Sequence, residues 1–245
     1  MINNEDVGYS GNGMTDVFFL RAEEQRMNFS KLVPYIWMLG DGLLTTIKLT
    51  VLSAVFGFLI AVILVLMAIS KKSVFTKFVE VYSTGIRAMP MLLQLFIVYF
   101  AFPQILGNLF NLSAYSAAVI ALSFNGAAYY AEVMRGGIIS IDKGQQEAAK
   151  ALGIGRGRIL AGIVFPQAMK RILPSMLSEF VLLFKETALV SQIGVKDLFY
   201  TGTTIGKNTY SLFEPYIAVA VIYYVIVMLM AYGTSLIEKR LRISD

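Results

Sequence analysis

The sequence predicts an all-α integral membrane protein with five transmembrane helices. Hydrophobic residues make up 57% of the 245 residues and charged residues 15%, whereas soluble domains carry about 45–50% and about 25%. A soluble fold of this composition would leave extensive apolar surface in water. Several apolar segments also reach the roughly 20 residues that a helix needs to cross a hydrocarbon core of about 30 Å.

Three charge-free segments predict membrane spans directly, at residues 49–70, 113–131 and 215–237. Two further spans, at 78–102 and 176–195, are interrupted by charged residues. These are Glu80, Arg87, Glu179, Lys185 and Glu186. A charge in hydrocarbon costs at least ~2.5–3.5 kcal/mol and usually faces a cavity or a partner, so these residues are also candidates for function.

The lysines and arginines predict an outside N-terminus and a cytoplasmic C-terminus. Under this orientation the cytoplasmic segments are 70–77, 135–174 and 238–245. These segments hold Lys71, Lys72, Lys77, Arg135, Lys143, Lys150, Arg156, Arg158, Lys170, Arg171, Lys239, Arg240 and Arg242. The outer loops, 101–112 and 196–214, hold only Lys196 and Lys207. Cytoplasmic loops carry an excess of Lys and Arg, so the net charge of +5 indicates orientation rather than nucleic-acid binding.

The predicted organisation is an extracytoplasmic tail over 1–40, a transmembrane domain over 41–237 and a cytoplasmic tail over 238–245. Residues 1–13 are polar and rich in Gly and Asn, which predicts disorder, and 14–29 form a candidate amphipathic interfacial helix. We expect no cleavable signal peptide, because no basic segment leads directly into a short apolar core.

The chain has neither Cys nor His, which excludes disulfides and zinc–thiolate sites and disfavours membrane metalloproteases, haem proteins and Ser/His proteases. We also find no phosphate-binding loop of the form G-x-x-x-x-G-K-[ST]. The nearest segment, 202–208, has too few residues between its glycines and ends in Asn. Segment 153–158 has Arg158 in place of the third glycine of a dinucleotide fingerprint. The chain is therefore expected to be no enzyme and to need a partner for energy.

The long cytoplasmic loop, 136–174, predicts structure of its own. Residues 145–152 are good helix formers, and Gly153 stands where a left-handed residue would end that helix. A second helical stretch is expected from about Gly157 until Pro166 kinks or ends it. Alanines give the first helix a small face, which fits either a groove on a partner protein or an amphipathic helix resting on lipid headgroups.

The loop resembles the EAA loop of ABC-importer permeases, in its Glu147-Ala-Ala, Gly153, Pro166 and Pro174. Three further segments resemble span motifs of the polar amino acid group of these permeases: the one that begins Arg87-Ala-Met-Pro, the one that begins Asn125-Gly-Ala-Ala, and the one that begins Phe184-Lys-Glu-Thr. Ala88-Met89 replaces the usual Gly-Thr and Gly126 replaces a small polar residue. The likeness covers about 43–237.

This resemblance implies a type I permease subunit in the bacterial cytoplasmic membrane that imports a polar or charged L-amino acid, or cystine. Its implied partners are ABC ATPase subunits that use ATP-Mg, a second permease subunit, an external amino acid-binding protein and membrane lipid. No cofactor or metal is expected on this chain. Glu147, Ala148, Ala149 and Gly153 would belong to a coupling helix that seats in the ATPase.

Two other classes of function are weighed against import driven by a separate ATPase. A self-contained secondary carrier or channel is the main alternative, although such carriers are commonly built from inverted repeats and none is evident. A membrane-embedded enzyme would have to work with carboxylates alone. The amino acid transported, and whether the second permease is an identical copy or a paralogue, stay open.

Polar residues in the spans are candidates for the substrate path. Arg87 is a candidate for the substrate carboxylate, with snorkelling or pairing with Glu80 as the alternative. Gln94 follows seven residues later and is expected on the same helical face. Asn125, Tyr129 and Glu132 share a second face.

Glu132 is the candidate acceptor for the substrate ammonium, with pairing to Arg135 as the alternative. In the fourth span, Lys185 and Glu186 are adjacent and must point in different directions. One of them is expected on the substrate path and the other at the partner subunit. Thr187 and Ser191 are path candidates, or else hydrogen-bond helix to helix.

Overall fold

The structure is a computed structural model that describes residues 28–70, 72–107 and 112–242. The expected disordered segment 1–13 lies outside these residues, as does all but the end of the expected interfacial helix 14–29.

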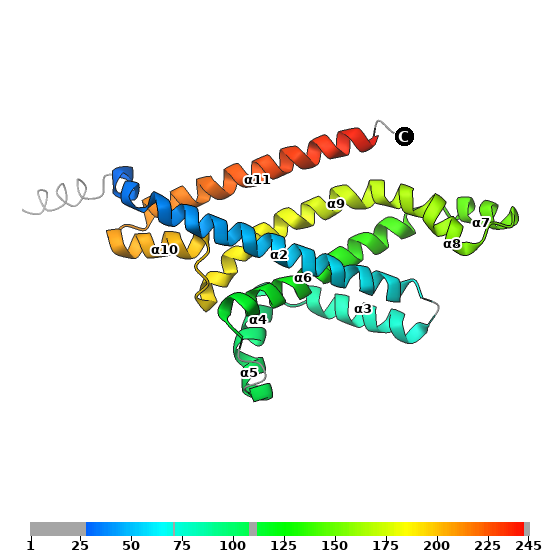
Figure 1. Ribbon diagram of the computed structural model, residues 1–245, viewed down its shortest axis with the longest axis horizontal. Helices are drawn as coiled ribbons and strands as arrows, with labels where there is room; N and C mark the ends of the chain where they lie inside the picture. Colours follow the sequence, from blue (N-terminus) through cyan, green and yellow to red (C-terminus); the bar gives the residue numbers. More distant parts are fainter. Residues whose placement is uncertain (1–27, 71, 108–111, 243–245) are drawn as a thin grey trace, which may run out of the picture.

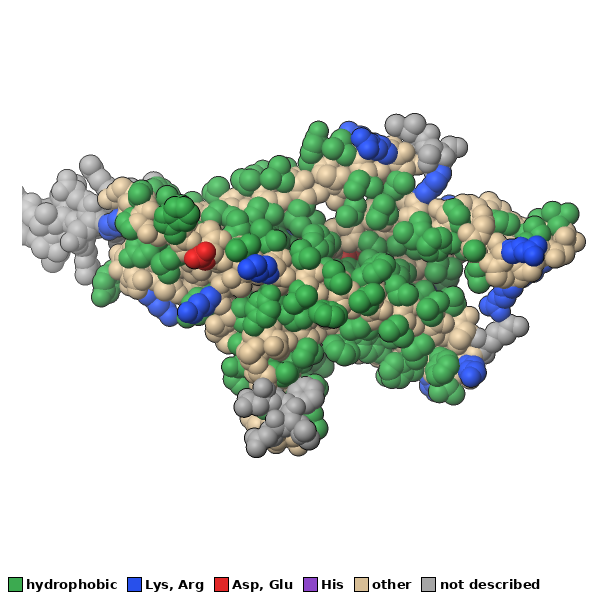
Figure 2. All heavy atoms as spheres, viewed as in Figure 1, with side chains coloured by type: hydrophobic (Ala, Val, Ile, Leu, Met, Phe, Trp, Pro, Cys, Tyr) green, Lys and Arg blue, Asp and Glu red, His purple; other side chains and the backbone are tan. Residues whose placement is uncertain are grey.

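Four long helices run along the long axis of the molecule (Figure 1): α2 (Ile36–Ala68), α6 (Ala114–Ile139), α9 (Phe165–Glu186) and α11 (Phe213–Arg242). Apolar side chains cover most of the middle of the face seen in Figure 2, and Lys and Arg lie mostly toward its ends. Among the described residues, Phe29–Ala68 and Phe213–Leu241 are long and apolar enough to cross a membrane. The bent pair Ser73–Arg87 and Met91–Leu106 would be a third span.

Helix α2 begins well before the predicted span of 49–70. Lys48 and Asp41 had limited that prediction, but both side chains are exposed on the helix. A helix of 33 residues rises about 50 Å at 1.5 Å per residue, which is longer than the hydrocarbon core. Asp41 and Lys48 lie in the first half of α2, so the rest of the helix is free of charge.

Helices α2 and α6 pack closely because α6 is rich in small residues. Ala117, Ala118, Ala121, Ala127 and Ala128 are almost completely buried. A Cβ atom added to Gly57 of α2 would lie 3.0 Å from the Ser123 carbonyl oxygen of α6. Small residues permit such backbone approach between membrane helices, so α6 forms the centre of the fold.

The predicted span at 78–102 is not one continuous helix, because the chain bends by 104° between α3 (Ser73–Arg87) and α4 (Met91–Phe96). Pro90 caps α4 with an extended backbone (ψ 137°). Proline has no N–H to continue a helix and restricts the residue before it. After α4 the chain continues through a π-helical turn (Ile97–Ala101) into α5 (Phe102–Leu106), which projects sideways from the bundle in Figure 1.

At one end of the molecule the predicted loop helix is confirmed as α7 (Lys143–Ala151). Gly153 has the predicted left-handed backbone, with φ of +75°. Of the two predicted effects of Pro166, the end of the following helix does not occur. Helix α8 (Arg156–Ile159) passes through a π-helical turn (Leu160–Val164) into α9, and Pro166 stands in the first turn of α9, directly after the π-helical turn.

The opposite end holds three short elements. A 3₁₀ turn (Phe29–Tyr35) precedes α2, and a second (Thr187–Ile193) ends the α9 helix inside the predicted span 176–195. Helix α10 (Leu198–Thr209) lies in the predicted outer loop 196–214 and was not expected. The C-terminal end of α11 points toward the α7 end (Figure 1).

Candidate functional site

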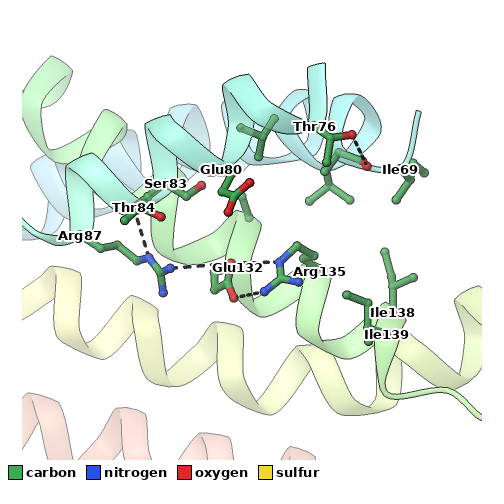
Figure 3. A pocket seen from close by; sticks show the side chains of 14 residues that line it. Ile69, Thr76, Glu80, Ser83, Thr84, Arg87, Glu132, Arg135, Ile138 and Ile139 are labelled. Atoms are coloured by element: carbon green, nitrogen blue, oxygen red, sulfur yellow. Dashed lines mark hydrogen bonds and ion pairs between the residues drawn. The ribbon is translucent and has the colours of Figure 1, made fainter. Parts of the chain in front are cut away.

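A cavity of about 570 Å³ opens between α2, α3 and α6, toward the end that carries α7. Four charged side chains line it: Glu80 and Arg87 from α3, and Glu132 and Arg135 from α6. Figure 3 shows them pointing toward one another across the space between the two helices. Hydroxyls from α3 line the same wall, those of Thr76, Ser83 and Thr84.

Glu132 is shared between two arginines. The Arg135 guanidinium contacts both oxygens of the Glu132 carboxylate. Its Nε donates to Oε2 at 3.1 Å, and its Nη2 pairs with Oε1. The Arg87 Nη2 atom lies 3.9 Å from the same Oε2 atom, while Arg87 Nε donates to the Ser83 carbonyl at 3.3 Å. Pairing of Glu132 with Arg135 is therefore present, and Arg87 faces Glu132 rather than Glu80 (Figure 3).

The long Arg87–Glu132 contact leaves part of the guanidinium unused. About a third of each of these two side chains is exposed, 36% for Arg87 and 32% for Glu132. A bidentate carboxylate ligand prefers donors at 2.7–2.9 Å, so a substrate carboxylate would bind Arg87 more closely than Glu132 does. The Glu80 carboxylate lines the same cavity and offers an acceptor for an ammonium group.

Gln94 does not share the cavity of Arg87, because the bend at Pro90 lies between them. It belongs to a second cluster, where its Nε2 atom donates to the Ile86 and Met89 carbonyls, each at 2.9 Å, and to Asn125 Oδ1 at 3.1 Å. Asn125 Nδ2 donates in turn to Glu186 Oε2 at 2.9 Å. The cluster joins the bend to the third and fourth predicted spans.

The remaining candidates from the fourth span lie apart from the cavity. Lys185 is exposed and faces α11 across a hollow of about 400 Å³, while Glu186 points to α6, so the two adjacent side chains do diverge. Thr187 donates to the Phe184 carbonyl at 2.7 Å and Ser191 to the Ala188 carbonyl at 2.8 Å. Tyr129 is half-buried on α6 and is not among the residues that line the cavity.

Helix α7 is fixed to the bundle by one side and presents the other. Ala149 is 4% exposed and packs in the same core cluster as Ile159 and Val164. The amide of Gly153 donates to Lys150 and that of Ile154 to Ala149, which is the double bond of a Schellman motif.

The opposite face of α7 carries the exposed Glu147, Ala148 and Ala151, followed by Leu152, which is 80% exposed. Small side chains beside an exposed leucine leave this face of α7 accessible to another surface.

Sequence reasoning missed a buried polar contact at the other end. Asp197 is completely buried and caps α10, accepting from the amides of Phe199 and Tyr200 at 3.2 and 2.8 Å. Burial raises the pKa of Asp197 to about 6. The Thr46 hydroxyl of α2 accepts from the Leu198 amide at 3.1 Å. An Asp before a helix is a recognised capping signal, but the segment had been read as a loop.

Comparison with known proteins adds three matches. Residues 53–243 match the family described as binding-protein-dependent transport system inner membrane component. The arginine transport system permease protein ArtQ of Bacillus subtilis is 40% identical over 89% of this chain and 99% of that protein. The putative glutamine transport system permease protein GlnP of Rickettsia bellii is 39% identical over 87% and 97%.

A solved structure agrees with this assignment. The crystal structure of an amino acid ABC transporter with histidines superposes with a TM-score of 0.84 and 37% identity, over 88% of this chain and 100% of that one. The chain thus belongs to the family of inner membrane permease components of binding-protein-dependent transport systems.

Proposed function

We propose that this chain is the permease subunit of an ABC importer that moves a polar or charged amino acid into the cell. The observation that carries the proposal is the pairing of an exposed, rigidly capped helix, α7, with a charged cavity at the same end of one bundle. ATP-Mg is consumed by separate ATPase subunits, and an external binding protein supplies the substrate. A second permease subunit completes the pathway.

In this proposal five spans place the N-terminus outside and the α7 end in the bacterial cytoplasm. The Lys and Arg residues of 135–174 then lie inside, as the positive-inside rule requires. The cavity opens toward the cytoplasmic side, where a substrate leaves the transporter. Its Arg87 binds the substrate carboxylate, and Glu80 and Glu132 bind the ammonium.

The exposed side of α7 docks on the ATPase. Glu147, Ala148 and Leu152 form the contact, and Gly153 holds the sharp turn that returns the chain to α8. The surface-helix alternative would place Leu152 in the headgroup region of the membrane instead. Because the chain contains no Cys, a Leu152→Cys substitution introduces a single thiol that distinguishes these alternatives. Cross-linking of this thiol to the ATPase supports docking, and its labelling from the lipid phase supports the surface helix.

In this proposal the residues of the second cluster stabilise the packing of the helices around the pathway. Gln94, Asn125 and Glu186 connect the bend to α6 and α9. Thr187 and Ser191 bond to their own helix backbone nearby. Lys185 faces the hollow beside α11, and we assign it to contact with the second permease subunit.

The proposal is tested by uptake into proteoliposomes that contain the permease, its ATPase and its binding protein. Radiolabelled arginine, glutamine and cystine serve as probes. Uptake is expected to require ATP inside the vesicles and to survive collapse of the ion gradients. Uptake that persists without ATP and disappears with the gradients would favour the secondary carrier.

The substrate site has its own test. Arg87→Ala and Glu132→Ala are expected to lower substrate-dependent uptake while leaving assembly with the ATPase intact. Because Arg135 also pairs with Glu132, Arg135→Gln serves as the comparison. It removes the Arg135–Glu132 ion pair and leaves Arg87 in place. Loss of assembly in Arg87→Ala would show that this residue is structural.

A further inference from the structure

A second cavity, which adjoins the charged one, forms an apolar groove of about 450 Å³ between α2, α6 and α9. On α2 its lining runs from Phe58 to Ile69. Across from α2 it is lined by the π-helical turn that precedes α9 and by the first half of α9 itself. All of its lining residues are aliphatic, aromatic or Met. The groove shares Val65, Ile69 and Ile138 with the charged cavity, but none of the four charged residues of that cavity lines it.

The dimensions of the groove select its occupant. From Phe58 to Ile69 a helix rises ~16 Å at 1.5 Å per residue, which is close to the thickness of one leaflet, about half of a ~30 Å hydrocarbon core. A groove of this length, with a volume of about 450 Å³ and only apolar side chains in its lining, matches one acyl chain of a single leaflet.

The rim of the groove is open on the side that would face lipid. Phe58, Leu66, Phe165 and Met169 all line it and remain 44%, 60%, 59% and 36% exposed. Val65, Val164 and Ile172 form its floor and are at most 7% exposed. An apolar chain lying on that floor would be covered by the four side chains of the rim.

Basic residues stand at the α7 end of the groove. Ile69 and Leu160 line it there, and the sequence places Lys72 three residues beyond the first and Arg158 two residues before the second. Both basic side chains are exposed, and the Lys72 ammonium lies 5.5 Å from the centre of the Phe75 ring. Basic residues beside a groove between membrane helices at the cytoplasmic surface are a recognised arrangement for anionic headgroups.

We propose that the groove binds one acyl chain of an anionic phospholipid from the leaflet at the α7 end, with its phosphate held between Lys72 and Arg158. The bound chain would pack against the π-helical turn Leu160–Val164, which contacts α7 and leads into α9. The bound lipid thereby stabilises the position of this turn, and with it the position of α7. The side of the membrane follows from the orientation proposed above, but lipid binding itself does not depend on transport.

The full chain in mixed phosphatidylglycerol and phosphatidylcholine vesicles provides the test. Electron spin resonance with spin-labelled lipids counts the motionally restricted lipids, and native mass spectrometry counts those kept after detergent extraction. One phosphatidylglycerol per chain is expected to stay bound. Val62→Trp fills the groove and is expected to lose it, whereas Ile63→Trp, next in sequence but 58% exposed and outside the groove, is expected to keep it.

The headgroup is tested separately. Preference for phosphatidylglycerol over phosphatidylcholine is expected to fall about fivefold for each of Lys72→Gln and Arg158→Gln, since each basic residue near an anionic surface is worth ~1 kcal/mol. Equal retention of both lipids by the wild-type chain would overturn the headgroup assignment. Absence of any retained phospholipid on the wild type, or its retention by Val62→Trp, would overturn the groove assignment.

A protein occupant is also distinguishable. In this Cys-free chain, a disulfide between two copies of a Met169→Cys variant would show that a second permease reaches the rim of the groove. That result would overturn the lipid site while leaving ATP-driven uptake, and hence the proposed function, unaffected.

Discussion

Replacement of Gln94 by Leu removes the side chain that stabilises the bend between α3 and α4. The Gln94 amide donates to the Ile86 and Met89 carbonyls on the far side of Pro90 and to Asn125 on α6. Leu is apolar and of similar size, so the change removes hydrogen bonds with little change in packing.

The expected loss follows from the partners that Gln94 leaves behind. The Ile86 carbonyl still accepts from the Met89 amide at 3.2 Å, and Asn125 still donates to Glu186. The Met89 carbonyl loses the Gln94 donor, and because Met89 is half-buried, the lost partner costs the lower part of the ~1–3 kcal/mol range, about 1–2 kcal/mol. Loss of the interhelical bond to Asn125 adds ~0.6 kcal/mol, the average in membrane proteins. We expect Gln94→Leu to lower the unfolding free energy by about 2–3 kcal/mol.

Unfolding of the purified chain from mixed micelles by increasing SDS, followed by circular dichroism, measures this loss. Gln192→Leu is the matched control, because Gln192 is exposed and makes only a 3.5 Å contact with Ser191. Exposed substitutions usually change stability by less than ~0.5 kcal/mol. If the two variants lose equal stability, the hydrogen bonds of Gln94 do not stabilise the bend.

Three further predictions follow from the helix packing, the cap of α7 and the buried carboxyl. Gly57→Ala should lower the unfolding free energy by about 1–2 kcal/mol, because the added methyl group contacts α6. Gly40→Ala has open space around it and should raise the unfolding free energy slightly. Equal effects of the two variants in SDS unfolding would refute the close approach of α2 and α6. Gly153→Ala should strain the left-handed cap by ~1–2 kcal/mol and reduce ATP-driven uptake more than Gly155→Ala, and equal uptake would argue against the cap. Because the pKa of Asp197 is about 6 in the fold and about 4 when unfolded, stability should fall as the pH rises from about 4 to about 6. Asp197→Asn should flatten that profile, and an unchanged profile would assign the dependence to another group.

The α7 segment shows what local sequence determines. Helix formers followed by Gly153 predicted both the helix and its left-handed end, and the structure has both. A cap depends on backbone sterics within a few residues, so the sequence alone was sufficient. The pairing of Glu132 with Arg135, three residues apart on one helix, was predictable for the same reason.

The bend at Pro90 shows what hydropathy does not determine. Residues 78–102 have the composition of a span, yet the chain turns by 104° within it. The polar partners that stabilise the turn, Gln94 with Asn125 and Glu186, are distant in sequence. Their pairing depends on the packing of α4, α6 and α9, which periodicity does not encode.

Helix α10 was missed for a related reason. The predicted loop 196–214 is less apolar than the spans, and the helix in it begins at the buried cap Asp197 and packs on α2 through Thr46. Burial of Asp197 requires the neighbouring helices to be in place. Tertiary packing therefore decides this element.

ATP-driven uptake by a reconstituted Glu147→Arg variant, compared with the wild type, tests whether α7 couples this chain to a separate ATPase. Glu147 is exposed on α7 and lies outside the charged cavity. We expect the variant to insert and bind phospholipid normally but no longer to retain the ATPase or accumulate substrate on addition of ATP. Full ATP-driven accumulation by Glu147→Arg, or accumulation by the wild type in the absence of ATP, would contradict transport energised by a separate ATPase through α7.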